Sequence, residues 1–405
     1  YKNKIINIKK IIISISKYLM FISKFIFHVR DKRNYNYKYI FLSFDLLNNT
    51  KLYDHFYGDI QKFNNKFNKD FKILYLKFKN FKKNDFNYYD WLNRKDIFWI
   101  SKEFFKSLFI IKKIKFNKLT LRGNKISYSS SYFCKEFINN IFTNDQNLLF
   151  EIIILRSFSN LFKFNNVQKL IYPFENKPIE YAILKGLKLS KSNTISLAYL
   201  HANYSLGHIS INNFYKYNKI RPTFFLSKNI FQKKRFINNF NWKSSNFINI
   251  GNLRYSEKFN NKIIQDNILF IPGFGFELIY FAEWCKEMKI VFNKFNLFIK
   301  PYPHAWFNDQ TIAYKILNNN NIKYELIENI SDAIKKCKIV LFCSTSAGLE
   351  LCNHQRHIIH LNLDRNHLIN AIEDYNTHKF IKSFDNPQNL SKFLFSYNFN
   401  KDPLK

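Results

Sequence analysis

The sequence predicts an α/β protein with two domains, each a doubly wound parallel sheet covered by helices. Its 405 residues fit two domains of ordinary size better than one. Hydrophobic residues make up 46% of the chain, which is enough to form a core in each domain. In the second half of the chain, short apolar runs alternate with helical patterns, and this alternation is typical of parallel strands connected by helices.

An apolar segment, residues 1–30, precedes the first domain. Lys17 and Lys24 interrupt it, so we do not expect it to span a membrane. It is expected either to lie along a membrane surface or to pack on the protein as an amphipathic helix. The first strand is predicted at Tyr39–Phe44. Asp45 would then lie at the carboxyl edge of the sheet, where open α/β folds bind ligands, which makes it a candidate catalytic residue.

Two later strands of the first domain also end next to ionisable side chains. Val167–Tyr172 leads into a loop that carries Glu175, and Thr194–Leu200 ends at His201. The two side chains can therefore face one cleft, and a carboxylate such as Glu175 can act as a general base toward an attacking hydroxyl. The alternatives are that Glu175 only braces its loop by pairing with Lys177, and that His201 is a structural hydrogen-bonding residue.

The domain boundary is predicted near Arg221. This gives an N-terminal domain of residues 31–221, a C-terminal domain of residues 222–385 and a C-terminal tail of residues 386–405. The strands expected in the second sheet are Ile268–Ile271, Leu297–Lys300, Ile322–Leu326, Ile339–Phe342 and His357–Leu361.

The turn after Ile339–Phe342 carries the strongest binding signal in the chain. Ser344, Thr345 and Ser346 are small and bring hydroxyl donors to the start of the next helix, where unpaired amides favour an anion such as phosphate. Glu350 follows about one turn later and can reach a sugar or ribose hydroxyl pair. The alternative is that the three residues only cap the helix.

Two glycines follow the predicted strand Ile268–Ile271. Gly273 and Gly275 permit close approach of the backbone to a ligand. The pattern is G-x-G-x-E rather than the G-x-G-x-x-G of dinucleotide-binding folds, and no Walker motif occurs, so neither of those site types is predicted.

The net charge of +35 favours anionic partners but does not choose among them. Lysines are spread through the whole chain, and the abundance of Lys, Asn, Ile, Phe and Tyr is the pattern expected from an A+T-rich genome. A nucleotide-sugar, a phospholipid surface and a lipid-linked phosphate acceptor all fit. No specific nucleic-acid partner is expected, although a basic membrane-binding or nucleic-acid-binding protein without catalysis stays open as an alternative class.

The five cysteines form no C-x-x-C pair and have no histidine partners at metal-ligand spacing. A reduced, cytoplasmic compartment fits them best, and zinc is not expected.

Several of these segments resemble GT-B glycosyltransferases of bacterial surface or capsular polysaccharide biosynthesis. The S-T-S-A-G-L-E turn at 344–350 resembles the donor-nucleotide end of the C-terminal domain. The turn at 300–304 resembles the K-P-H-P element of sialyltransferase-like and Kdo-transferase-like enzymes but departs from it by reading K-P-Y-P-H. The segments at 172–182 and 197–201 resemble their E-N-x-P-W-E and G-Y-x-H elements, with Ile179 where tryptophan is common.

The resemblance implies a GT-B fold in which two Rossmann-like domains face a central cleft. It implies transfer of a sugar, with a CMP-activated acidic sugar favoured, to a surface-polysaccharide or lipid-linked glycan acceptor. The transfer is expected to be inverting, with His201 as a second candidate base. Lys300 and His304 would approach the nucleotide phosphate, and Arg254 would add positive charge that stabilises the departing phosphate.

No cofactor or metal is expected, because the chain has no D-x-D pair of the kind that holds a divalent cation in other glycosyltransferases. The expected location is the cytoplasm, including the inner face of the cytoplasmic membrane. A CDP-polyol phosphotransferase and a nucleotide-sugar epimerase are the alternatives that share the fold.

Overall fold

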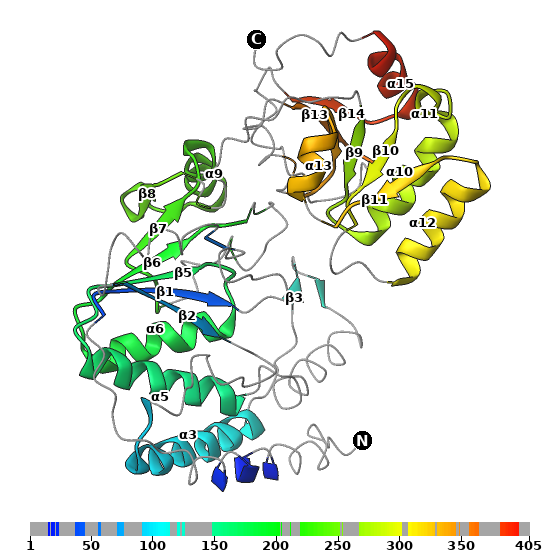
Figure 1. The fold of residues 1–405 in the computed structure, drawn as a ribbon. Coiled ribbons are helices and arrows are strands. Elements are labelled where there is room, and N and C mark those ends of the chain that lie inside the picture. The colour runs from blue at the N-terminus through cyan, green and yellow to red at the C-terminus, as the bar shows by residue number, and fades with distance from the viewer. Residues whose placement is uncertain are drawn as a thin grey trace. The chain divides into compact units, whose positions relative to one another are not determined.

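The structure of the protein is a computed structural model. It describes residues 15–16, 18–20, 22–23, 37–44, 56–57, 71–76, 91–113, 120–121, 124–125, 148–202, 204, 211, 219–251, 253, 267–301, 307–328, 330–345, 348, 356–363 and 381–396. The chain forms two compact units, and each is built around one six-stranded sheet (Figure 1). The prediction of a two-domain α/β fold is confirmed.

The first sheet has the strand order β2-β1-β5-β6-β7-β8, and the pairs from β2 to β7 are parallel. Its strands are β1 (Tyr39–Phe44), β2 (Phe71–Leu76), β5 (Lys169–Pro173), β6 (Ile195–Tyr199), β7 (Phe224–Ser227) and β8 (Phe247–Asn249). Because β7 and β8 belong to it, this sheet continues past Arg221, where the sequence predicted the domain boundary. A short antiparallel pair, β3 (Thr120–Leu121) and β4 (Asn124–Lys125), lies outside the sheet.

The helices of the first half are α3 (Arg94–Lys113), α5 (Leu148–Phe164) and α6 (Pro178–Ser190), and α9 (Ile230–Phe240) follows β7. In Figure 1, α5 and α6 lie side by side along the first sheet. Their close packing depends on Gly186, because a Cβ at this position would lie 2.6 Å from the carbonyl oxygen of Leu155 in α5. Apolar side chains cover the inner face of α5, including Ile154 and Phe158, which are fully buried.

The second sheet is parallel throughout and has the strand order β11-β10-β9-β12-β13-β14. Its strands are β9 (Ile268–Ile271), β10 (Leu297–Ile299), β11 (Tyr324–Leu326), β12 (Ile339–Phe342), β13 (His357–Leu361) and β14 (Lys382–Phe384). The helices are α10 (Gly275–Glu287), α11 (Val291–Lys294), α12 (Phe307–Asn319), α13 (Ile330–Lys336) and α15 (Pro387–Ser396). This strand order is that of a doubly wound nucleotide-binding domain.

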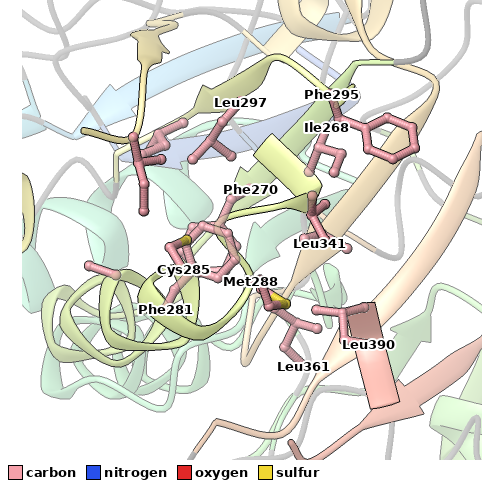
Figure 2. Close-up of a cluster of buried hydrophobic side chains, with 14 of the residues drawn as sticks. Ile268, Phe270, Phe281, Cys285, Met288, Phe295, Leu297, Leu341, Leu361 and Leu390 are labelled. Atoms are coloured by element: carbon pink, nitrogen blue, oxygen red, sulfur yellow. The ribbon is translucent and has the colours of Figure 1, made fainter. Parts of the chain in front are cut away.

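The central strands of the second sheet are buried on both faces, as their unbroken apolar runs predicted. Alternate residues point to opposite sides. Phe270 and Leu341 face a core that α10, α11, α12 and α15 cover, shown in Figure 2. Leu269 and Val340 face the opposite core, to which α13 contributes.

The last helix differs from its prediction as part of a C-terminal tail. Leu390 and Leu394 of α15 are fully buried and belong to the core of the second unit, where Figure 2 shows Leu390 near Leu361 and Leu341. α15 is therefore part of the second unit.

The described residues between 15 and 23 are helical. The Tyr18 ring stacks on Phe104 of α3 at a centroid distance of 5.3 Å, and its hydroxyl makes a 2.6 Å hydrogen bond with that of Ser101. This part of the N-terminal segment therefore packs on the protein. Within the described residues, we find no helix with both the length and the apolarity required to cross a bilayer.

Candidate functional site

The second sheet has its topological switch point between β9 and β12. From β9 the sheet extends through β10 and β11, and from β12 it extends the other way through β13 and β14. Open α/β folds bind ligands outside the carboxyl ends of the strands at such a point. The last residues of the two strands, Ile271 and Phe342, are paired in the register. The loops that follow them therefore start side by side.

Glu277 joins these two loops. It is the third residue of α10, and its side chain is buried, with 6% of the residue exposed. Its Oε2 accepts hydrogen bonds from the amides of Gly273 at 2.5 Å and Phe274 at 3.2 Å. Its Oε1 accepts from the Ser344 hydroxyl at 2.5 Å and from the Ser344 amide at 3.3 Å. One carboxylate thus ties the β9–α10 loop to the turn after β12.

Burial and hydrogen bonding act in opposite directions on this carboxyl group. Burial is the largest effect and raises the pKa of Glu277, because a charged carboxylate loses its hydration. The hydrogen bonds from Ser344, Gly273 and Phe274 lower the pKa, because they stabilise the charged form. The net result is a pKa above the ordinary value.

The two glycines predicted to allow close approach of a ligand also have close neighbours within the chain. A Cβ at Gly273 would lie 2.9 Å from the amide nitrogen of Thr345, and a Cβ at Gly275 would lie 2.5 Å from a carboxylate oxygen of Asp309 in α12. Both glycines are therefore required by the packing of the chain on itself.

Ser344, a predicted donor-binding residue, donates from both its amide and its hydroxyl to Glu277, and these bonds stabilise the turn. Ser344 and Thr345 precede the helix of which Gly348 is part. Ser346 and Glu350 lie outside the described residues.

Lys300 lies at the same edge of the second sheet, directly after β10. Its backbone amide donates to the carbonyl of Phe270 in β9 at 3.0 Å. Burial lowers the pKa of its ammonium group, and the negative charge of Glu328 opposes this shift. A half-buried cation thus directly follows the strand next to β9. Arg254 and His304 lie outside the described residues.

In the first sheet, Glu175 and His201 follow neighbouring strands. β5 and β6 pair in register at Pro173 and Tyr199, and each candidate residue lies two positions beyond its strand. Glu175 forms an ion pair with Lys177, the alternative that the sequence left open. His201 is buried, with 6% exposed. Asp45 lies outside the described residues.

A buried glutamate, Glu180, supports the loop that carries Glu175. It is the third residue of α6, and its carboxylate accepts from the amides of Glu175 at 2.9 Å, Asn176 at 3.1 Å and Lys177 at 3.2 Å. Burial raises the pKa of Glu180 to about 8 although these bonds lower it. Asn176 takes a left-handed conformation, with φ of 56°, which lets consecutive amides converge on one carboxylate.

Gln232, the third residue of α9, supports the loop before its own helix, as Glu180 does. Its Oε1 accepts from the amide of Lys228 at 2.9 Å, and its Nε2 donates to the carbonyl of Ala202, next to His201, at 2.8 Å. Glu180, Gln232 and Glu277 were not among the residues predicted from the sequence. The signal was present, because Glu or Gln at the third position of a helix is half of a capping box.

Among the described residues, no group of three or more His, Cys, Asp or Glu side chains is placed to hold a metal ion. The thiols of Cys285, Cys337 and Cys343 are free and buried.

Two six-stranded parallel sheets flanked by helices, in two units of one chain, constitute the GT-B fold of glycosyltransferases. A glycosyltransferase from Rickettsia africae is similar with a TM-score of 0.51 and 11% identity, over 91% of each chain. TarM is similar with a TM-score of 0.50 and 12% identity, over 91% of this chain and 93% of its own. A putative UDP-N-acetylglucosamine 2-epimerase from Listeria monocytogenes has a TM-score of 0.47 and 10% identity, over 91% of this chain and 90% of its own.

At these identities the similarity concerns the fold. No protein-family model matches the sequence, and no curated protein does so either.

Proposed function

We propose that the protein is a glycosyltransferase that moves a sugar from a nucleotide-sugar to a glycan acceptor. The observation that supports this most is the switch point of the second sheet, where the glycine-containing β9–α10 loop, the small residues after β12 and the cation of Lys300 lie at one edge of a GT-B domain. Such an edge offers amides, hydroxyls and positive charge to a phosphate.

We place the donor phosphates at the turn after β12 and at Lys300, not at the β9–α10 loop. The amides of Gly273 and Phe274 already bind Glu277, so this loop is not the phosphate site that it forms in dinucleotide-binding folds. Thr345, Ser346, Arg254 and His304 complete the proposed site. Positive charge there would stabilise the departing nucleotide, and no metal ion is required for this. Glu350 would bind a sugar or ribose hydroxyl.

The donor class that we favour is a CMP-activated acidic sugar, because of the K-P-Y-P-H turn at 300–304. The acceptor would be a surface polysaccharide or a lipid-linked glycan, met in the cytoplasm or at the inner face of the cytoplasmic membrane. In an inverting transfer the acceptor hydroxyl must lose its proton as the new bond forms. Glu175, His201 and Asp45 are the proposed candidates for this base.

A thermal-shift panel of CMP, CDP, UDP, GDP and NAD tests the proposal. A ligand that binds only the folded state stabilises it by about 2.7 kcal/mol at 100 times its Kd. We expect one pyrimidine nucleotide to stabilise the wild type, also in the presence of EDTA. Lys300→Met should weaken its binding by about tenfold or more, because a charge-assisted contact contributes about 1.5–3 kcal/mol. Lys289→Met, an exposed lysine just beyond α10, is the control and should bind like the wild type.

Absence of any nucleotide shift would refute the proposal. If polynucleotides or anionic vesicles then bound well near physiological ionic strength, the basic binding protein without catalysis would be the better explanation. Conversion of a nucleotide-sugar to its isomer without an acceptor would instead identify an epimerase.

A further inference from the structure

Glu277 differs from an ordinary helix-capping residue. In a capping box, the third residue of the helix accepts from the backbone of its own N-terminal loop. Glu180 does only this, because its three donors, Glu175, Asn176 and Lys177, belong to the loop before its own helix. Glu277 uses one oxygen in this way and the other for Ser344, which is 67 positions away in the chain.

The bond to Ser344 fixes the distance between two backbones. At Gly273 the two loops approach so closely that a Cβ would lie 2.9 Å from the Thr345 amide nitrogen and 3.0 Å from the Ser344 carbonyl carbon. The position of Thr345 relative to β9 therefore depends on the Glu277 carboxylate. Thr345 is also the first residue of the proposed phosphate site after β12.

Glu277 also brings a negative charge to amides that would otherwise suit an external anion. The amides of Gly273 and Phe274 converge on Oε2 directly before the first turn of α10. A phosphate at that place would have to displace a buried carboxylate. The phosphate is thus directed away from the β9–α10 loop.

We propose that Glu277 is a positioning residue of the donor site, which holds the turn after β12 in place by its bonds to Ser344 and excludes phosphate from the β9–α10 loop. This inference rests on the proposed function. Glu277 itself does not touch the donor, so its removal should weaken nucleotide binding through the displaced turn.

The test compares nucleotide affinity among four variants, using whichever nucleotide of the panel binds the wild type. Glu277→Gln keeps the size of the side chain but replaces one acceptor oxygen by an NH2 group, which must face a donor of either loop. Ser344→Ala removes one bond and keeps the carboxylate. The double variant combines both changes. Glu283→Gln makes the same chemical change on an exposed face of α10, where Glu283 pairs with Lys286.

We expect Glu277→Gln to raise the nucleotide Kd by about tenfold or more, as loss of supporting partners does at other preorganised sites. The circular dichroism spectrum should stay that of the folded protein. Ser344→Ala should show part of the effect, and the double variant should be little worse than Glu277→Gln, because both changes break one link. Glu283→Gln should bind like the wild type.

Three results would overturn the inference. Glu277→Gln could fold and bind with wild-type affinity, Ser344→Ala and Glu277→Gln could act additively, or Glu283→Gln could weaken binding equally. If Glu277→Gln does not fold, Ser344→Ala decides, since wild-type affinity in this variant would exclude the link. Failure of the wild type to bind any nucleotide would instead refute the proposed function, and this outcome is distinct from the others.

Discussion

Gly273→Ala gives a direct test of the spacing between the two loops of the second sheet. Among the described glycines, the one with a positive φ is Gly251, so alanine at 273 is opposed by lack of space and not by backbone strain. The new Cβ would collide with the Ser344 hydroxyl oxygen, its nearest neighbour, and would lie 2.9 Å from the Thr345 amide nitrogen, which is backbone and cannot rotate away. The two loops must therefore separate by about 0.5 Å to reach ordinary contact, which begins near 3.4 Å.

This separation should lower stability and nucleotide affinity together. Overpacking of this kind costs about 1–3 kcal/mol. At about 2–4 °C per kcal/mol, the unfolding midpoint should fall by several degrees. Because Gly273 donates to Glu277 at 2.5 Å, the displacement also strains the link to Ser344. Calorimetry measures the fall in the unfolding midpoint. Titration with the nucleotide that binds the wild type measures the loss of affinity.

Gly186→Ala is the matched control. Its Cβ would lie 2.6 Å from the Leu155 carbonyl oxygen between α5 and α6, so it should also destabilise the protein, but in the first unit. Nucleotide affinity should then stay at the wild-type value. If Gly273→Ala lost stability without losing affinity, or kept both, the argument that loop spacing determines the donor site would be wrong.

Two further predictions concern pH and the acceptor side. Burial lowers the pKa of His360 to about 4 from 6.5, so its contribution to stability is complete above pH 6.5 and is lost as the pH falls toward 4. Across this pH range the free energy of unfolding should change by about 3 kcal/mol because of His360. In His360→Gln the unfolding midpoint should therefore fall less steeply between pH 6.5 and 4. A slope equal to that of the wild type would contradict this. Glu175→Gln should lower the rate of sugar transfer by about 10²–10⁴-fold with unchanged nucleotide binding if Glu175 is the base. An unchanged rate would show that Glu175 only pairs with Lys177, an interaction expected to contribute about 0–1 kcal/mol.

Local sequence was sufficient to locate the central strands. Tyr39–Phe44, Ile268–Ile271, Ile339–Phe342 and His357–Leu361 have the predicted bounds. Each is a short run of mainly apolar residues between polar stretches, and strands buried on both faces have this pattern. The small residues after β9 and β12 likewise identified the edge at which the candidate site lies.

The sequence did not predict strand β14, the place of α15 in the core or the extent of the first sheet. β14 has three residues, none of them fully buried, so its sequence shows no apolar run. α15 was assigned to a tail, although Leu390 and Leu394 belong to the core. The boundary was predicted near Arg221, while the membership of β7 and β8 in the first sheet depends on strand pairing that local sequence does not encode.

The sequence alone therefore determined the fold class, the central strands and the edge of the second sheet that carries small residues and Lys300. The tertiary structure decided what these residues contact. Glu277 reaches Ser344, and Gly273 lies against Thr345, because the strand order places β12 beside β9. β9 and β12 are separated by β10 and β11 in the chain and become neighbours only when the whole sheet forms. No local sequence pattern could therefore show that Gly273 packs against the turn after β12, or that Ser344 bonds Glu277.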